Sequence, residues 1–405
     1  MINGTYIPRL EYLEKIKPFM GKNLIKVLTG QRRVGKSYML FQIMDEIARQ
    51  GPETSILYIN KELHDFWDLR TGEDLYRYAR AHKKNDGMTA LLIDEIQEIE
   101  HFEDPLRSLL AEGGWDIYCT GSNAELLSGE LATYLAGRHI EIEIHPLSYR
   151  EFLQFHKLEN TVESLNNYLR FGGLPYLASI GLTEAVVLEY LKNVQSSILL
   201  KDVVAREKIR QIDFLETLLE YLADNVGNLF SATSISKYLK SQRISVPVPT
   251  ILSYLRALER AFIIRKARRT DIRGMKIFEV GEKYYFEDLG LRNILLGSMG
   301  PTEIGKLIEN AVYLHLIERG FRVTIGWLDG YEIDFVAEKN DKKIYVQAAY
   351  LIVNEDTKKR EYGNLERVDD NYPKYVVSMD EIPGPVNVRG IRQMKLRDFL
   401  LDNLE

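Results

Sequence analysis

Five short β-rich runs alternate with amphipathic helical stretches in the first 145 residues. The runs are residues 24–29, 55–60, 90–96, 115–120 and 140–145. This alternation is typical of an α/β domain with a mostly parallel sheet. The first four runs are largely apolar, which predicts strands that are covered on both faces. The fifth run alternates apolar and polar residues, which suits a strand at the edge of the sheet.

The pattern changes after this domain. Helical periodicity follows, without a convincing strand, and is interrupted at Gly172, Gly173 and Pro175. Next come two predicted helices joined by a turn, then a strand and a basic loop, the pattern of a helix-turn-helix with a wing. The last part predicts one helix followed by three or four strands, a small α/β domain. The predicted parts are therefore an α/β domain at 1–145, a helical lid or linker at 146–230, a winged helix at 231–298 and a C-terminal domain at 299–405.

Size and composition agree with a chain of several domains. At about 150 residues per domain, 405 residues predict roughly two to three hydrophobic cores. No apolar run approaches the ~20 residues that cross a bilayer, so we expect no membrane partner. The first ten residues, MINGTYIPRL, lack the apolar core of a signal peptide. The single cysteine, Cys119, cannot form an internal disulfide. These features together predict a cytoplasmic protein.

The strongest chemical signal follows the first apolar run. Residues 30–37 read GQRRVGKS, which is the G-x-x-x-x-G-K-S pattern of a phosphate-binding loop between a strand and a helix. Glycines let backbone N–H groups close around phosphate oxygens, and the helix N-terminus favours an anion. Lys36 is expected to neutralise the β/γ-phosphates, and the Ser37 hydroxyl to ligate Mg²⁺. The residues expected to contact nucleotide are Gly30, Arg33, Val34, Gly35, Lys36, Ser37, Tyr38 and Ser122.

The third apolar run ends in two carboxylates, and this favours hydrolysis over simple nucleotide binding. Asp94 is the expected Mg²⁺ partner, and Glu95 is positioned to orient and deprotonate the attacking water. Ser122 and Asn123 follow the fourth run, where they are expected to sense the γ-phosphate; Gly-Ser-Asn is also ordinary turn chemistry. Arg138 is a candidate arginine for the γ-phosphate, in cis or in a neighbouring subunit. The alternative is that Arg138 is simply a surface residue.

Several motifs together resemble a bacterial and archaeal family of P-loop ATPases with an AAA-like N-terminal domain, a winged helix and a C-terminal domain similar to restriction endonucleases. The resemblance covers residues 1 to about 380. It implies ATP as the nucleotide, with Mg²⁺, and a relation to AAA-like and signalling NTPases. The motifs that carry it are residues 30–37, Leu92-Ile93-Asp94-Glu95, Thr120-Gly121-Ser122-Asn123, Pro146-Leu147-Ser148, Gly172-Gly173-Leu174-Pro175 and Glu332-Ile333-Asp334-Phe335.

Positive charge is concentrated in residues 231–276. This segment carries 11 Lys/Arg against two acidic residues, a net charge of +9, while the whole chain has a net charge of −6. A basic helix-turn-helix with a wing suits contacts with DNA phosphates. The alternative is that its basic face docks on the acidic remainder of the chain.

The resemblance to restriction endonucleases implies a metal site that is incomplete here. Such nucleases hold Mg²⁺ with an Asp on one strand and a Glu two residues before a Lys on the next. Glu309 and Asp334 are present, but Gln347 stands in place of the Glu and Ala349 in place of the Lys. A neutral amide is a poor Mg²⁺ ligand, and alanine does no proton chemistry. We therefore expect a nuclease-like fold without nuclease activity.

Three functions from different classes remain at this point. The leading hypothesis is a Mg²⁺-dependent ATPase whose nucleotide state, ATP or ADP, repositions the winged helix and the C-terminal domain for an unidentified protein partner. The second is a DNA-binding or DNA-processing ATPase with residual nuclease activity. The third is a nucleotide-dependent scaffold that hardly turns over.

Overall fold

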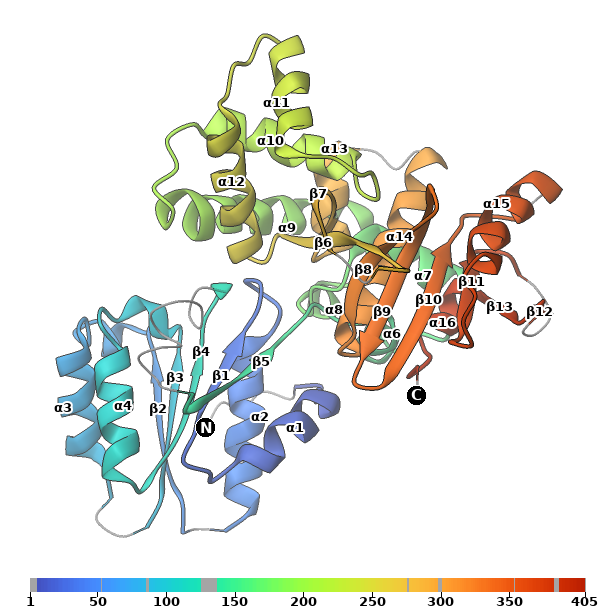
Figure 1. Ribbon diagram of the computed structural model, residues 1–405. Coiled ribbons are helices and arrows are strands. Elements are labelled where there is room, and N and C mark those ends of the chain that lie inside the picture. The colour runs from blue at the N-terminus through green and yellow to red at the C-terminus, as the bar shows by residue number, and fades with distance from the viewer. Residues whose placement is uncertain are drawn as a thin grey trace. The chain divides into compact units, whose positions relative to one another are not determined.

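The structure is a computed structural model, shown as a ribbon in Figure 1. It describes residues 6–51, 53–84, 87–124, 137–274, 277–297, 301–352, 354–381 and 386–404. Lys276 of the basic segment lies outside these ranges. The chain forms two compact units, Met1–His145 with Arg260–Phe262, and Pro146–Glu259 with Ile263–Glu405. Within the described ranges, no helix is both long and apolar enough to cross a membrane.

The first unit is an α/β domain built on a five-stranded sheet in the order β2-β3-β4-β1-β5 (Figure 1). Every neighbouring pair in this sheet is parallel. The predicted α/β fold with a mostly parallel sheet is therefore confirmed. The elements are α1 (Leu10–Ile16), η1 (Lys17–Phe19), β1 (Ile25–Thr29), α2 (Lys36–Arg49), β2 (Ser55–Asn60), η2 (His64–Phe66), α3 (Gly72–His82), β3 (Thr89–Asp94), η3 (Ile96–Glu98), α4 (Glu103–Glu112), β4 (Trp115–Thr120) and β5 (His139–Glu143).

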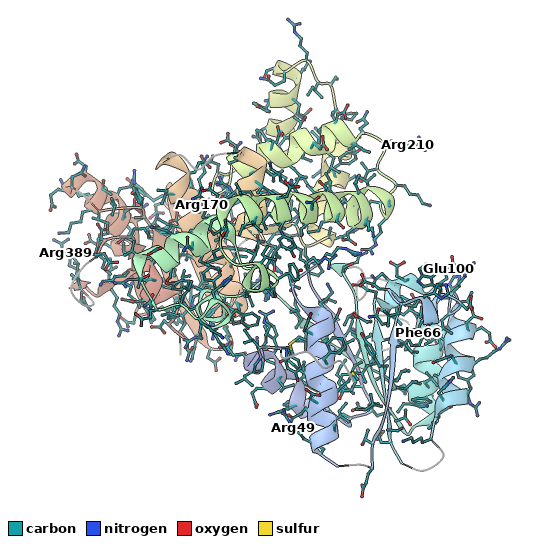
Figure 2. The ribbon with its side chains drawn as sticks, turned by 180° about the vertical axis from the view of Figure 1, so that it is seen from behind. Arg49, Phe66, Glu100, Arg170, Arg210 and Arg389 are labelled. Carbon is teal, nitrogen blue, oxygen red and sulfur yellow. The ribbon has the colours of Figure 1, made fainter. Side chains whose placement is uncertain are left out.

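Burial along the strands follows their place in the sheet. Strands β1, β3 and β4 are buried along their whole length, and alternate residues of them pack with α3 and α4. Strand β5 lies at the edge, as its alternating pattern predicts. The expectation that residues 55–60 are covered on both faces is wrong, because β2 is the other edge strand and is mostly half-buried. Beyond β2, Phe66 packs edge-on against Tyr78 of α3 (Figure 2).

The second unit begins with helices. They include a π-helical turn, η5, which continues directly from α9. The helices of this part are α6 (Tyr149–His156), α7 (Val162–Phe171), α8 (Leu177–Ile180), α9 (Glu184–Ser197), η5 (Ile198–Ala205), α10 (Ile212–Asp224), α11 (Ala232–Ser241), α12 (Val248–Arg260) and α13 (Leu289–Leu296).

The helical periodicity breaks at Gly172 and Gly173, and a later segment of the chain, the one that begins α13, packs there. The buried Asp288 carboxylate caps α13 by accepting from Leu291 N at 2.9 Å, and it also accepts from Gly173 N at 2.7 Å. A Cβ on Gly173 would lie 2.4 Å from the Leu147 carbonyl oxygen. Burial raises the pKa of Asp288 to about 6, although backbone donors oppose the shift. The two glycines are therefore required by close backbone packing.

The second unit also contains an eight-stranded mixed sheet in the order β12-β13-β11-β10-β9-β8-β6-β7 (Figure 1). The β6–β7 hairpin, which the sequence analysis placed in the winged helix, pairs with β8 in parallel register. One sheet thus includes strands from both the predicted winged helix (231–298) and the predicted C-terminal domain (299–405). The elements are β6 (Ile264–Asp271), β7 (Ile277–Phe286), α14 (Pro301–Glu318), β8 (Arg322–Leu328), β9 (Tyr331–Lys339), β10 (Lys342–Ala348), α15 (Glu355–Glu366), β11 (Lys374–Ser378), β12 (Val386–Val388), β13 (Ile391–Lys395) and α16 (Leu396–Phe399).

Candidate functional site

The GQRRVGKS segment forms the loop between β1 and α2. Gly30 has φ +138°, and a Cβ there would lie 2.2 Å from the Ile144 carbonyl oxygen, so only glycine fits. Gly35, with φ +98°, is the residue before α2, which begins at Lys36. Arg33, also left-handed at φ +72°, is exposed. The loop therefore has the strand before it, the helix after it and the glycine conformations that phosphate binding requires.

The lysine of this loop is held inside it. Lys36 is buried, and its Nζ donates to the carbonyl oxygens of Gly30 and Gln31, each at 2.9 Å. The Gln31 side chain is also buried, and neither of its amide atoms has a hydrogen-bond partner among the described residues. Buried polar groups are normally satisfied by protein, water or ligand. The loop therefore fits a bound phosphate group.

Arg9, which belongs to none of the motifs in the sequence, holds the phosphate-binding loop by a hydrogen bond. Arg9 is buried, and its Nη1 donates to the Val34 carbonyl oxygen at 3.2 Å and to the His145 carbonyl oxygen at 2.8 Å. Its backbone N also donates to Gln42 Oε1 at 2.9 Å. Arg9 thus joins the phosphate-binding loop, α2 and the segment after β5. Its distance along the chain from all three explains why no local motif pointed to it.

Strand β4 lies between the loop strand and the acidic strand, and its last residue connects the two acidic positions. The Thr120 hydroxyl donates to Asp94 Oδ1 at 2.5 Å and accepts from the Glu95 backbone N at 2.9 Å. Glu95 is left-handed, with φ +57°. Thr120 therefore positions both acids through one oxygen atom. In the sequence, Thr120 is visible only as part of the Thr120-Gly121-Ser122-Asn123 motif, which indicates no role for its hydroxyl.

Asp94 is the buried acid of the pair. Burial raises its pKa, while hydrogen bonds from Thr120 and Ser37 and the charge of Lys36 oppose the shift. Tyr58 of β2 donates to the second carboxylate oxygen, Oδ2, at 3.3 Å. The two predicted metal ligands, Ser37 and Asp94, are thus brought together from the loop and from β3. A hydroxyl beside a carboxylate suits Mg²⁺, which prefers hard oxygen ligands.

The other predicted site residues near the carboxyl ends of the parallel strands differ in exposure. The Glu95 carboxylate is half-buried and accepts a hydrogen bond from Gln97 Nε2. Ser122 and Asn123 are buried directly after β4, where Gly121 N donates to the Leu28 carbonyl oxygen at 3.0 Å. Tyr38 is 57% exposed and packs edge-on against Phe41. All of these residues follow the carboxyl ends of parallel strands, the usual edge for ligands in such sheets.

Arg138 lies at the opposite end of the strands, beside the amino end of β1. Its carbonyl oxygen accepts from Ile25 N at 2.9 Å, at the beginning of β1, and it is followed by His139, which pairs with Ile25. Gly30, the first residue of the phosphate-binding loop, lies five residues after Ile25. At 3.3 Å per residue, the two are about 16 Å apart along β1. That span exceeds the reach of an arginine side chain. The expected role of Arg138 in cis is therefore wrong, and only the role in a neighbouring subunit stays a prediction.

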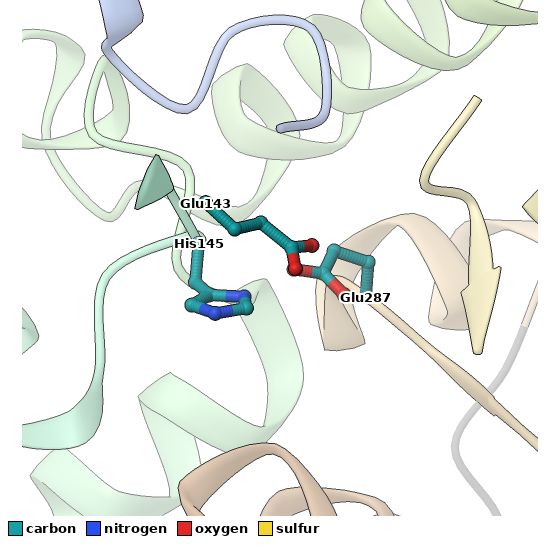
Figure 3. A group of neighbouring side chains, drawn as sticks. All are labelled: Glu143, His145 and Glu287. Atoms are coloured by element: carbon teal, nitrogen blue, oxygen red, sulfur yellow. The ribbon is translucent and has the colours of Figure 1, made fainter. Parts of the chain in front are cut away.

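One polar residue ends β5, and a second lies two positions later, where the first unit's main segment ends. Glu143 and His145 occupy alternate positions there (Figure 3). The His145 backbone N donates to Tyr12 Oη at 3.1 Å. Glu287, also drawn in Figure 3, belongs to the second unit, so we assign no joint metal site to these three residues.

Comparisons with known proteins identify both the domain and the family. The family described as "AAA domain" matches residues 22–153, and "Domain of unknown function (DUF8612)" matches residues 162–302. An "Uncharacterized protein" of Haemophilus influenzae is 36% identical, over 99% of this chain and 100% of its own. The chain belongs to the same family. "Uncharacterized protein MJ1544" of Methanocaldococcus jannaschii is 32% identical, over 85% of this chain and 78% of its own. The AAA domain supports a nucleotide-binding ATPase.

Solved structures are less similar. The Aeropyrum pernix ORC1 protein in complex with DNA is 12% identical, over 73% of this chain and 94% of its own, with a TM-score of 0.32. AMPPCP-bound DnaA from Aquifex aeolicus is 16% identical, over 62% of this chain and 87% of its own, with a TM-score of 0.31.

Proposed function

We propose that this protein binds ATP with Mg²⁺, hydrolyses it, and acts as a nucleotide-driven switch. The observation that carries the proposal is the Thr120 hydroxyl, which bonds the Asp94 carboxylate and the Glu95 backbone N at the edge where the AAA domain has its phosphate-binding loop. A strand that orients two acids beside such a loop is arranged for chemistry at a γ-phosphate.

Each side chain then has a distinct role. Lys36 exchanges its two carbonyl partners for β/γ-phosphate oxygens, and Ser37 and Asp94 hold Mg²⁺. When bound, Mg²⁺ neutralises charge that develops on the phosphates. Glu95 orients the attacking water and accepts its proton, while Gln97 holds the Glu95 carboxylate in place. Ser122 and Asn123 sense the γ-phosphate from the end of β4.

The bonds of Arg9 support the switch. A bound phosphate changes the position of the loop, whose Val34 carbonyl oxygen accepts from Arg9. Arg9 also bonds the carbonyl oxygen of His145, the residue after which the chain enters the second unit. A change in the loop therefore has a hydrogen-bonded route to the connection between the units.

Two substitutions separate binding from hydrolysis. In Lys36→Ala, the charge opposite the phosphates is removed, so nucleotide affinity should fall at least tenfold. In Glu95→Gln, binding should persist while turnover falls about 100-fold or more, the usual contribution of a general base. Titration with a fluorescent ATP analogue and a phosphate-release assay measure the two effects.

The matched control is Glu98→Gln, the same chemical change at an exposed position in η3. It should leave both binding and turnover unchanged. Equal turnover in Glu95→Gln and Glu98→Gln would remove Glu95 from the mechanism. ATP-loaded Glu95→Gln is also the form in which we expect to capture the protein partner.

A second candidate function, DNA binding, is favoured by exposed cations on the two helices of the predicted winged helix. Lys237 and Lys240 of α11, Arg243 after it and Arg256 of α12 are exposed, with no ion pair among the described residues. In the hairpin, Lys266 pairs with Glu259 and Glu282, and Arg273 with Asp329, whereas Arg268 is exposed. The proposed DNA contact is therefore the helix pair, together with the exposed Arg268 of the hairpin.

A further inference from the structure

A lysine from the β6–β7 hairpin lies among the acids of the nuclease-like part. Lys283 of β7 is 2% exposed. Its Nζ lies 2.9 Å from Glu309 Oε1 on α14, 2.7 Å from Glu332 Oε1 and 4.0 Å from Asp334 Oδ1, both on β9. One ammonium thus contacts two carboxylates and lies close to a third. Glu309 and Asp334 are the two acids that the resemblance to restriction endonucleases assigned to a metal.

The other hydrogen bonds of these acids come from neutral donors. The Tyr285 hydroxyl donates to Glu309 Oε1 at 2.7 Å, and Ala348 N donates to Asp334 Oδ2 at 2.8 Å. Gln347 turns its amide oxygen toward the Asp334 backbone N, at 3.4 Å. An amide at this position adds no negative charge. The cluster therefore places a single buried positive charge against three carboxylates.

The neighbouring carboxylates favour the charged form of Lys283. Burial alone would lower the pKa of Lys283, but Glu309, Asp334 and Glu332 together raise it above its ordinary value. Burial, followed by the charge of Glu309, raises the pKa of Asp334 well above its usual range. The lysine stays charged at neutral pH, so it does not act as a base.

We propose that the Lys283 ammonium is the resident cation of this carboxylate cluster, in the place that a divalent metal ion would take. A metal ion and the ammonium exclude each other, because both need the same oxygens and their like charges repel at this separation. The cluster then needs no metal, and its ion pairs fasten the β6–β7 hairpin to α14 and β9. This inference is independent of the proposed ATPase activity.

Removal of the ammonium should therefore create a metal site. In Lys283→Ala, three carboxylates remain around an emptied position, and carboxylate oxygens are the ligands that Mg²⁺ and Mn²⁺ prefer. We expect the full-length variant to gain one Mn²⁺ at least tenfold tighter than the chain with Lys283, as measured by the loss of the free Mn²⁺ electron paramagnetic resonance signal. All proteins carry Asp94→Asn and no nucleotide, so that the AAA domain contributes no metal site.

Two further variants test whether the gained Mn²⁺ binds at the carboxylate cluster. Asp334→Asn added to Lys283→Ala should remove the gained Mn²⁺. The matched control, Lys342→Ala, removes an exposed lysine from β10 of the same sheet and should gain none. The proposal is overturned if the chain with Lys283 already binds a Mn²⁺ ion that Asp334→Asn abolishes. It is also overturned if Lys283→Ala gains no metal.

A stability measurement covers the case in which Lys283→Ala folds poorly. Loss of the ammonium leaves three uncompensated carboxylates, of which that of Asp334 is buried, so the variant should melt at a lower temperature than Lys342→Ala. A ligand that binds only the folded state raises the melting temperature. Mn²⁺ should therefore raise the melting temperature of Lys283→Ala and leave that of Lys342→Ala unchanged. Equal responses of the two variants to Mn²⁺ would contradict the proposal.

Discussion

A single hydroxyl, that of Thr120, connects the two acidic residues of the AAA domain. Thr120→Val keeps the shape of the side chain but leaves Asp94 Oδ1 and Glu95 N without this partner. We expect the free energy of unfolding to fall by about 1.5–3 kcal/mol, the contribution of hydrogen bonds to charged groups, and ATP turnover to fall by at least tenfold.

Thr89→Val is the matched control for this prediction. Thr89 is equally buried but lies at the other end of β3, where its hydroxyl bonds Ser55 at 2.9 Å. Urea unfolding and phosphate release measure the two effects. A Thr120→Val protein with the turnover of Thr89→Val would show that the hydroxyl only stabilises the fold.

His315 gives the second unit a pH dependence. It is buried on α14, and its Nε2 lies 3.0 Å from the Asp402 carbonyl oxygen. Burial, helped by the charges of Arg319 and Arg150, lowers the pKa of His315 to about 3. Between pH 6.5 and 3 the unfolded chain therefore binds a proton that the folded chain does not. Stability should fall by about 1.4 kcal/mol for each pH unit below 6.5.

This contribution is isolated by comparison with His315→Gln. From pH 7 to pH 5, the free energy of unfolding should fall by about 2 kcal/mol more in the natural chain than in His315→Gln. His64→Gln, at an exposed position, is the control and should follow the natural chain. Parallel pH profiles of the natural chain and His315→Gln would refute the assignment.

Among the elements, the packing of the segment after α7 against the segment before α6 depends on glycine. A Cβ on Gly173 would meet the Leu147 carbonyl oxygen at 2.4 Å and the Leu147 N at 2.9 Å, and these are backbone atoms that cannot move as side chains do. Gly173→Ala should therefore destabilise the second unit by roughly 1–3 kcal/mol, the typical cost of overpacking. Urea unfolding followed by circular dichroism measures this change.

Gly305 in α14 is the control for that prediction. A Cβ there meets no atom within 4 Å, and the residue is helical without a positive φ. Gly305→Ala should therefore stabilise the protein by about 0.5–1 kcal/mol, because alanine restricts the unfolded chain. The two glycine substitutions should thus have opposite signs. If both proteins were equally stable, packing at Gly173 would not be the constraint.

For the whole molecule, the charge distribution predicts the behaviour with DNA. If the exposed cations of the helix pair bind phosphates, replacing Lys237, Lys240 and Arg243 by alanine should weaken binding to every sequence. The slope of log K against log salt should become shallower by about 0.9 for each phosphate that the variant no longer neutralises. Fluorescence anisotropy across a salt series measures both quantities.

The control for this experiment removes the same net charge elsewhere. Lys192, Lys201 and Lys208 are also exposed, but they lie on α9, in η5 and just after η5. Their replacement by alanine should leave the slope nearly unchanged. Equal slopes in both triple variants, or no binding at low salt, would speak against the helix pair as a DNA-binding surface.

The sequence by itself determined the features that depend on neighbours along the chain. The period of apolar residues predicted the strands of the parallel sheet, and the glycine spacing located the phosphate-binding loop. The two acids after β3 were also identified, because a polar pair at the end of an apolar run is a local signal. Local signals suffice here since strand and loop conformations depend on nearby residues.

Only the tertiary structure decided which distant residues meet. Arg9 reaches the Val34 carbonyl oxygen across 25 positions, and Thr120 reaches Asp94 across 26. Lys283 enters the carboxylate cluster because the β6–β7 hairpin pairs with β8, a pairing that no local pattern announces. The position of Arg138 at the opposite end of the strands likewise follows from strand register. Such contacts depend on strand order and register, which are set by the packing of the whole unit and not by any one segment.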